Sequence, residues 1–543
     1  MRKNDRSRIT NWLAAALLSS PGFRTNLIER VSLKFQANLS RERLQTLVIL
    51  SSNYWFVRDL FRIVYVSVLI RVIALMRFAP EIRSLYLKIP KRRTSCFGSS
   101  DRDVLATTAT LDWPATSALR DRLVDFLLPQ GSWRRIVDLH VFTEPELDLK
   151  TLVESSTNGA RCVRIFGSKK DFTRNSTSTG RVNALLYEYF QIGERVFARQ
   201  HTAHEIRIVS RTILKIHEEL VLRGMKVDCG ERGEVLKRSA QLALGAGIRQ
   251  TSFKDLASMF ELASDELSEI CSKSVMAGED SCRARLHLTD AFARPITMDE
   301  FVFQCHLGLE RLFSEFSDVI ASALVGGTPG CDFDYRIYLI LYDGTSSARL
   351  MAFFSALRDV FTSSNLSISE LWRIRSPMVL TTSLWKKSSM WYHALRTLEE
   401  PYFLRRHGVV LAGQDLRGLP GEPSASDLFR SIAQSVCDLR NIMWESIRHR
   451  QTGRLADLLL GRIPVLWLIL SKGTIATSRG EALSECAKLD FPNFDQLEEL
   501  NHCAVSLAPK DLPPANSPIW EASLVQSCEL IDSMVEMAQC RIS

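Results

Sequence analysis

The sequence predicts an α+β protein in which a small α/β unit with a short mixed sheet occurs twice, each time followed by a helical region. Two observations predict this fold class. Short strand-type apolar runs concentrate in two stretches, residues 83–172 and 301–420, whereas the rest of the chain has helical periodicity. An Asp-x-Asp motif also opens a strand-like run in each stretch, at Asp101 and again at Asp332.

The first stretch contains strands around one helix. A turn over residues 96–100 leads into a run through residue 105 that predicts a strand. Residues 117–128 predict a helix, which ends at the turn 129–132. Residues 135–142 then alternate between apolar and polar, as in a half-buried strand.

The second stretch repeats this order. A glycine-rich turn over residues 326–330 precedes a predicted strand at 332–341, a helix at 348–361 and a second strand at 373–381. The predicted organisation therefore has five parts: an N-terminal helical segment (1–82), a first α/β domain (83–172), a helical domain (173–300), a second α/β domain (301–420) and a C-terminal helical domain (421–543).

Three pairs of segments align between the two stretches, which indicates an internal duplication. Residues 101–103 match 332–334 at an offset of 332 − 101 = 231. Residues 135–143 match 373–381 at 373 − 135 = 238, and residues 163–167 match 409–413 at 409 − 163 = 246. Small loop insertions would account for the growing offset. Chance similarity between two unrelated α/β units is the alternative.

Composition restricts the class of protein. The 543 residues are 46% hydrophobic and 24% charged, which excludes a disordered or fibrous chain. The net charge of +8 suits a phosphate-bearing ligand or RNA, although a merely basic surface has the same signature. The twelve cysteines form no Cys-x-x-Cys pair, so we expect reduced thiols in a cytoplasmic protein and no zinc site.

The most apolar segment, residues 55–78, is interrupted by arginines at 58, 62, 71 and 77. A bilayer-spanning helix needs about 20 predominantly apolar residues. We therefore expect a largely buried helix and no membrane span, with a membrane-surface role as the alternative.

The acidic residues of the first stretch suggest a metal site. Residues i and i+2 of a strand share a face, so Asp101 and Asp103 would project together, as would Asp332 and Asp334. Asp138, on a later strand, would supply a third carboxylate. Carboxylates grouped in this way suit Mg²⁺ or Mn²⁺, which leave room for substrate phosphates. The alternative is a set of solvated residues at a strand edge.

These residues resemble the core of the polymerase-beta-type nucleotidyltransferase superfamily, which includes the aminoglycoside nucleotidyltransferases. The turn Gly98, Ser99 and Ser100, the Asp-x-Asp strand and the third acid carry the resemblance. Residues 402–416 are similar to the segment that closes the catalytic domain in bacterial members, and residues 477–483 to part of their helical domain. The resemblance implies a nucleotide-binding fold with a magnesium-dependent transferase activity, in two tandem copies.

Neither copy matches the family pattern completely. Family members hold the nucleotide's phosphates with a Gly-Ser pair about a dozen residues before the acids. In the first copy this place falls near Ile89 and Pro90, so Gly98 to Ser100 together with Lys169 and Lys170 would have to bind the phosphates. In the second copy Ser322 and Gly326 would fill it, but Ser376 replaces the third acid.

Three functions follow from these patterns. In the first, an acceptor hydroxyl attacks the α-phosphate of a nucleoside triphosphate at Asp101, Asp103 and Asp138, and pyrophosphate leaves. In the second, the chain is a pseudoenzyme that serves in binding or regulation, because a fold does not fix a function. In the third, the two copies face each other and complete one site. The acceptor stays open: a small molecule, a protein or RNA.

Overall fold

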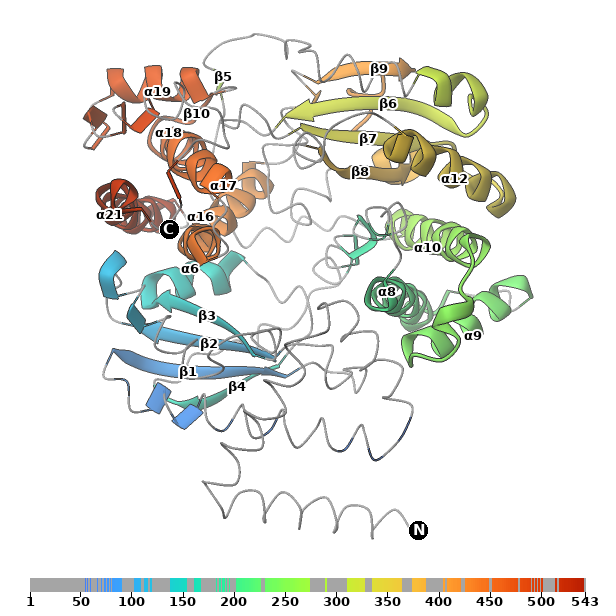
Figure 1. Ribbon diagram of the computed structural model, residues 1–543, viewed down its shortest axis with the longest axis horizontal. Helices are drawn as coiled ribbons and strands as arrows, with labels where there is room; N and C mark the ends of the chain where they lie inside the picture. The colour runs from blue at the N-terminus through green and yellow to red at the C-terminus, as the bar shows by residue number, and fades with distance from the viewer. Residues whose placement is uncertain are drawn as a thin grey trace.

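The computed structural model describes most of the two α/β regions and of the helices. The described ranges are 81–89, 102–108, 112–115, 137–153, 161–167, 202–225, 230–273, 289–290, 310–327, 335–363, 374–386, 408–420, 425–448, 452–476, 479–489 and 517–541, with isolated residues at 54–79, 118–119, 182–195, 404–405 and 491–514. The architecture is mixed, with two four-stranded sheets and many helices (Figure 1).

The first sheet has the strand order β3-β2-β1-β4. Its strands are β1 (Ile82–Ile89), β2 (Arg102–Thr108), β3 (Val137–Thr143) and β4 (Arg161–Phe166). Strand β1 is antiparallel to both β2 and β4, whereas β2 and β3 run parallel. Helix α6 (Glu144–Val153) begins directly where β3 ends.

The second sheet, with the order β8-β7-β6-β9, has the same topology. Its strands are β6 (Ile320–Gly327), β7 (Tyr335–Leu341), β8 (Ile374–Thr381) and β9 (Val409–Gly413). Strand β6 is antiparallel to β7 and β9, and β7 is parallel to β8. Helix α12 (Ser347–Ser363) lies between β7 and β8 in the chain, and α14 (Thr382–Lys386) follows β8 as α6 follows β3.

Irregularities in the two sheets also coincide. The register of β1 shifts between Ile82 and Ser84, and that of β6 shifts between Ile320 and Ser322, an offset of 320 − 82 = 238. A second shift follows Leu85 in β1 and Ala323 in β6, again at 238. Bulges are specific features of a strand, so the shared positions support the predicted duplication.

A glycine with positive φ lies against each irregular strand segment. Gly167 (φ 91°) directly follows β4 and Gly413 (φ 79°) is the last residue of β9, and they differ by the predicted offset of 246. A Cβ atom on Gly413 would lie 2.4 Å from the carbonyl oxygen of Ala321, and one on Gly167 would lie 2.3 Å from that of Arg83. Only glycine permits both the left-handed backbone and this close approach.

Replacing Gly413 with alanine is therefore expected to destabilise the protein by about 2–3 kcal/mol, since strain and a backbone clash coincide. Gly344→Ala, where φ is 73° but the surrounding space is open, isolates the strain alone. Gly418→Ala has neither feature and serves as the neutral control. Urea midpoints of the three variants would be compared. Equal midpoints for the first and the last would contradict this account of the bulge.

The remaining helices form two groups. The middle group contains α8 (Ala203–Leu222), α9 (Glu231–Ala243), the 3-10 turn η2 (Ile248–Gln250) and α10 (Phe253–Lys273). The C-terminal group contains α16 (Ala425–Arg448), α17 (Thr452–Asp457), the π-helical η4 (Leu458–Arg462), α18 (Ile463–Lys472), α19 (Arg479–Lys488), the 3-10 turn η5 (Pro518–Trp520) and α21 (Glu521–Cys540). A two-stranded parallel pair joins β5 (Thr289–Asp290) to β10 (Thr474–Ile475).

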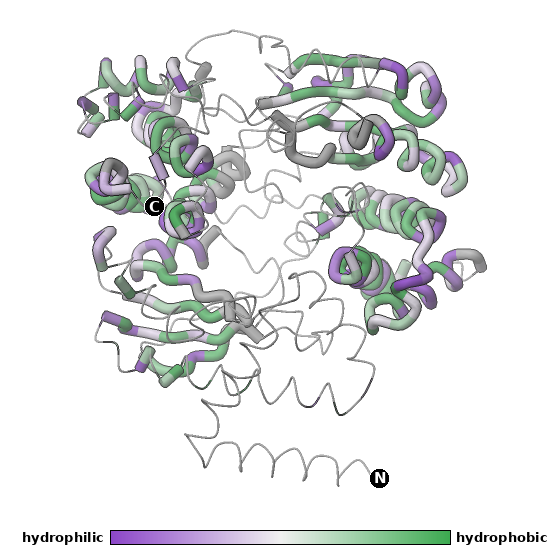
Figure 2. Tube along the Cα trace, viewed as in Figure 1, coloured by the Kyte–Doolittle hydropathy of each residue, from purple (hydrophilic) through white to green (hydrophobic). Residues whose placement is uncertain are grey.

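Local sequence accounts for these helices. A capping box between Thr202 and Glu205 begins α8, and its buried residues Ile206, Val209 and Ile213 recur at helical spacing. Pro464 follows η4, where its missing N–H and its ring prevent regular α-helical bonding and favour the wider π-turn. The strands are mainly apolar, whereas the helices alternate between apolar and polar residues (Figure 2).

Each helical group packs against the sheet of the other repeat. One core joins residues of α8, such as Ile213, and of α10, such as Phe260, to the second sheet and α12. Another core joins Leu149 of α6 to the C-terminal helices, with α16 and α21 against α6. Figure 1 shows this exchange: the orange and red C-terminal helices lie beside the first sheet, and the green middle helices lie beside the second. The sequence predicted the order of these regions but not their partners.

Candidate functional site

The first sheet brings two predicted acids into register. Strands β2 and β3 begin at the same end of the sheet and pair in parallel from Arg102 and Val137 onward. Asp103 is the register partner of Asp138, so the two residues occupy neighbouring positions on one face. The side chains of both acids lie outside the described residues, as do Asp101, the turn Gly98 to Ser100, and Lys169 and Lys170.

The same face becomes less buried toward these acids. The next residue of β3 on that face is His140, which is half-buried and pairs with the half-buried Leu105. Phe142 follows and is fully buried against Tyr86 and Leu147. The rings of His140 and Phe142 stack with centroids 6.2 Å apart. The face is therefore closed at Phe142 and less buried at His140 and Leu105, the described residues of this face that lie next to the acids.

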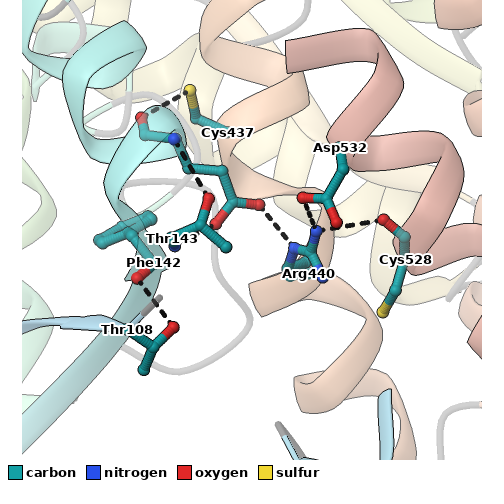
Figure 3. Close-up of polar contacts among 8 residues, drawn as sticks. Thr108, Phe142, Thr143, Cys437, Arg440, Cys528 and Asp532 are labelled. Atoms are coloured by element: carbon teal, nitrogen blue, oxygen red, sulfur yellow. Dashed lines mark hydrogen bonds and ion pairs between the residues drawn. The ribbon is translucent and has the colours of Figure 1, made fainter. Parts of the chain in front are cut away.

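Helix α6 is fixed to the far end of this face by a reciprocal cap. The Thr143 amide donates to Glu146 Oε2 (2.8 Å), and the Glu146 amide donates to Thr143 Oγ1 (3.3 Å). Thr108 Oγ1 donates to the Phe142 carbonyl at 3.5 Å and so links the ends of β2 and β3 (Figure 3). The strand that carries Asp138 thus continues into a capped helix.

A buried arginine then ties α6 to the C-terminal helices. Arg440 of α16 donates from Nε to Glu146 Oε1 at 2.6 Å, and its side chain is 2% exposed and that of Glu146 1%. Its Nη2 donates to the Cys528 carbonyl at 3.1 Å and to the Asp532 carboxylate, both on α21 (Figure 3). Burial opposes the charge, but Glu146, Cys528 and Asp532 outweigh it and raise the pKa of Arg440 above its ordinary value.

Further contacts support this junction. Lys150 of α6 pairs with Asp438 of α16 at 3.0 Å, and Cys437 Sγ approaches the Glu146 carbonyl oxygen at 3.5 Å. Burial raises the pKa of the Cys528 thiol to about 12, so this cysteine stays protonated and unreactive. Sequence patterns gave no signal for the junction, because its partners are about 290 residues apart.

The register of the second sheet corrects the predicted alignment of the two acidic motifs. Ile82 pairs with Thr108 and Ile320 pairs with Leu341, so β2 and β7 correspond at an offset of 341 − 108 = 233 rather than 231. At this offset Asp101 corresponds to Asp334, and Asp103 corresponds to Arg336. Asp332 and Asp334 precede β7 and lie outside the described residues.

Arginines therefore occupy positions in the second sheet where the first has acids. Arg336 is the register partner of Arg375 on β8, as Asp103 is of Asp138 on β3. The register of β7 with β8 shifts by one residue just after this pair. The expected counterpart of Asp138, Ser376, lies in that shift and does not pair with Arg336.

The predicted phosphate turn of the second copy is instead the interior of a strand. Ser322 is fully buried in β6, and its hydroxyl donates to the Gln414 carbonyl at 2.6 Å. Gly326 is also in β6, where a Cβ atom would lie 2.9 Å from the Leu404 side chain. Ser322 stabilises the contact with the end of β9, and Gly326 makes room for Leu404. Both residues thus have structural contacts in the sheet, and the expectation that they hold phosphate stays a prediction.

No helix in the described part of the chain is long and apolar enough to cross a membrane. No group of three or more His, Cys, Asp and Glu side chains gathers there as a metal site would, and the side chains of Asp103 and Asp138 do not belong to that part.

Comparisons with family models, curated proteins and solved structures gave no match for this chain.

Proposed function

We propose that the first repeat is a magnesium-dependent nucleotidyltransferase site that moves a nucleoside monophosphate from a nucleoside triphosphate to an acceptor hydroxyl. The register of Asp103 with Asp138 carries the proposal, because it brings two acids from separate strands to one face. Asp101, one residue before β2, would join them.

The donor set fits a hard divalent cation. Aspartate oxygens are the ligands that Mg²⁺ and Mn²⁺ take, and such ions keep positions free for phosphate oxygens. When bound, the ion would supply positive charge to the triphosphate and to the oxygen that leaves. Asp101, Asp103 and Asp138 would hold it, and Lys169 and Lys170, just after β4, would attract the outer phosphates.

The group transfer follows from this arrangement. The acceptor oxygen forms a bond to the α-phosphorus, and the bond from that phosphorus to the bridging oxygen of the β-phosphate breaks. Pyrophosphate leaves, and the hydroxyl proton passes to solvent. Half-buried His140 and Leu105 lie along the face beside the acids, where they would border a bound nucleotide.

The second repeat favours a binding role over catalysis. Its face is closed, since Tyr338 and Met378, the counterparts of Leu105 and His140, are fully buried and Trp385 contacts the Tyr338 ring. Its arginines cannot ligate a cation. The pseudoenzyme alternative thus applies best to this half of the chain.

Label transfer tests the proposal. The purified chain would be incubated with α-phosphate-labelled ATP, CTP, GTP or UTP and a cell extract that supplies acceptors. We expect labelled products and pyrophosphate with Mg²⁺ or Mn²⁺, and neither with excess chelator. Absence of transfer from all four nucleotides, together with absence of magnesium-dependent nucleotide binding, would overturn the proposal.

A further inference from the structure

The paired arginines of the second sheet form the feature with no role so far. Arg336 and Arg375 are register partners at the start of two parallel strands, the position where the first sheet has Asp103 and Asp138. Replacement of the two aspartates by two arginines reverses the charge at one end of a sheet that has the same topology.

Two arginines in register are unfavourable by themselves. Like charges at opposed positions of neighbouring strands repel each other. Arginine cannot relieve the repulsion by losing its proton. An anion between the two guanidinium groups would relieve it, because arginine binds phosphate oxygens with two parallel hydrogen bonds.

Other basic residues reach the same end of the sheet. Arg373 directly precedes β8. Val325 pairs with Val409, so the chain before β9 also arrives where β6 ends. Arg405 lies in that chain, next to Leu404 against Gly326, and donates from Nη1 to the Pro420 carbonyl at 3.1 Å. Asp332 and Asp334, just before β7, are the acids nearest in sequence to the pair.

The closed face limits where a ligand can bind. Tyr338 and Met378 are buried one step along the strands from the arginines, so no nucleotide can lie over the sheet there. A ligand of the two arginines would therefore have to bind at the rim of the sheet, which favours a compact anion over a catalytic complex with an acceptor.

We propose that the end of the second sheet at Arg336 and Arg375 binds a phosphate-bearing anion without a metal ion, either the polyphosphate of a nucleotide or free pyrophosphate. The proposal shares the alignment of the two sheets with the proposed function, but it does not require the first repeat to catalyse. The chain would then combine a metal-dependent site with a metal-independent one.

Isothermal titration in excess EDTA tests this site on the full chain. Pyrophosphate and ATP are the probes, and we expect at least one of them to bind with one equivalent per chain. The double variant Arg336→Gln/Arg375→Gln should bind about tenfold more weakly or worse, as expected for losing charged hydrogen bonds. Arg249→Gln, an exposed arginine in η2, is the matched control and should bind like the wild type.

The two probes and the variants distinguish the possible outcomes. Binding of pyrophosphate indicates a free-anion site, and binding of ATP alone indicates a nucleotide site; both support the proposal. No binding of either probe in EDTA, or equal binding by the double variant, overturns it and would mean that nearby carboxylates already neutralise the pair. If the glutamine variant does not fold, Arg336→Lys/Arg375→Lys keeps the two charges. We still expect it to bind the probes more weakly than the wild type, because lysine cannot form two parallel hydrogen bonds to a phosphate. The titration contains neither a metal ion nor an acceptor, so its failure is distinct from failure of the proposed transferase.

Discussion

Asp103→Asn is expected to lower nucleotidyl transfer by about 10²–10³-fold, comparable to the loss of one preorganised electrostatic group in an active site. Asparagine has nearly the same volume and keeps the backbone pairing of β2 with β3, but it removes a negative charge from the cation site. The variant should therefore fold normally. Steady-state pyrophosphate release at saturating Mg²⁺ measures the effect, and a thermal midpoint equal to that of the wild type shows that the fold persists.

The matched control is Asp334→Asn, an aspartate just before β7 that corresponds to Asp101 at the offset of 233. We expect its rate to stay within about twofold of the wild type, because this residue is not part of the proposed metal site of the first repeat. The reverse pattern, with transfer lost in Asp334→Asn and kept in Asp103→Asn, would place catalysis in the second repeat. If both variants release pyrophosphate at the wild-type rate, neither motif supplies a metal ligand that the reaction needs.

Much of the α/β regions was predictable from local pattern. The predicted strand at 135–142 is observed as β3 (Val137–Thr143), and the predicted strand at 373–381 as β8 (Ile374–Thr381). The predicted helix at 348–361 is observed as α12 (Ser347–Ser363). These elements have the full alternation or periodicity of their type, so propensity and burial agree.

The alignment of the acidic motifs failed for a physical reason. Side chains of a strand repeat every two residues, so a shift of two keeps each residue on its face and leaves the apolar pattern intact. The match of residues 101–103 with 332–334 and the true correspondence with 334–336 are then equally compatible with the sequence. Only the pairing of β7 with β6, through Ile320 and Leu341, distinguishes them.

The exchange of helical groups was also beyond local pattern. The buried stripe of α16, with Ile432, Val436 and Leu439, specifies that one face is covered but not which partner covers it. Arg440, at the edge of that stripe, reads in sequence as a surface residue. Its role depends on Glu146 and Asp532, which lie 294 and 92 residues away in the sequence.

Arg440→Met is expected to destabilise the first sheet and its C-terminal helices by about 3–5 kcal/mol, the usual cost of leaving a buried partner charge unpaired. Glu146 is almost completely buried and would lose its cationic partner, while the Cys528 carbonyl would lose its donor. Methionine keeps much of the side-chain length, so packing contributes little to the loss. Chemical denaturation monitored by far-UV circular dichroism gives the change.

A second variant isolates the charge. Arg440→Met/Glu146→Gln removes both members of the 2.6 Å pair and should recover a large part of the lost stability, because no buried ion remains unpaired. Arg349→Met breaks the exposed pair with Asp318 and should leave the free energy of unfolding almost unchanged, because solvent screens an exposed ion pair. If Arg440→Met costs no more than Arg349→Met, the junction does not stabilise the fold. Because α6 continues directly from the strand of Asp138, a real loss at Arg440 should also reduce transfer by the first repeat, and the double variant should restore both together.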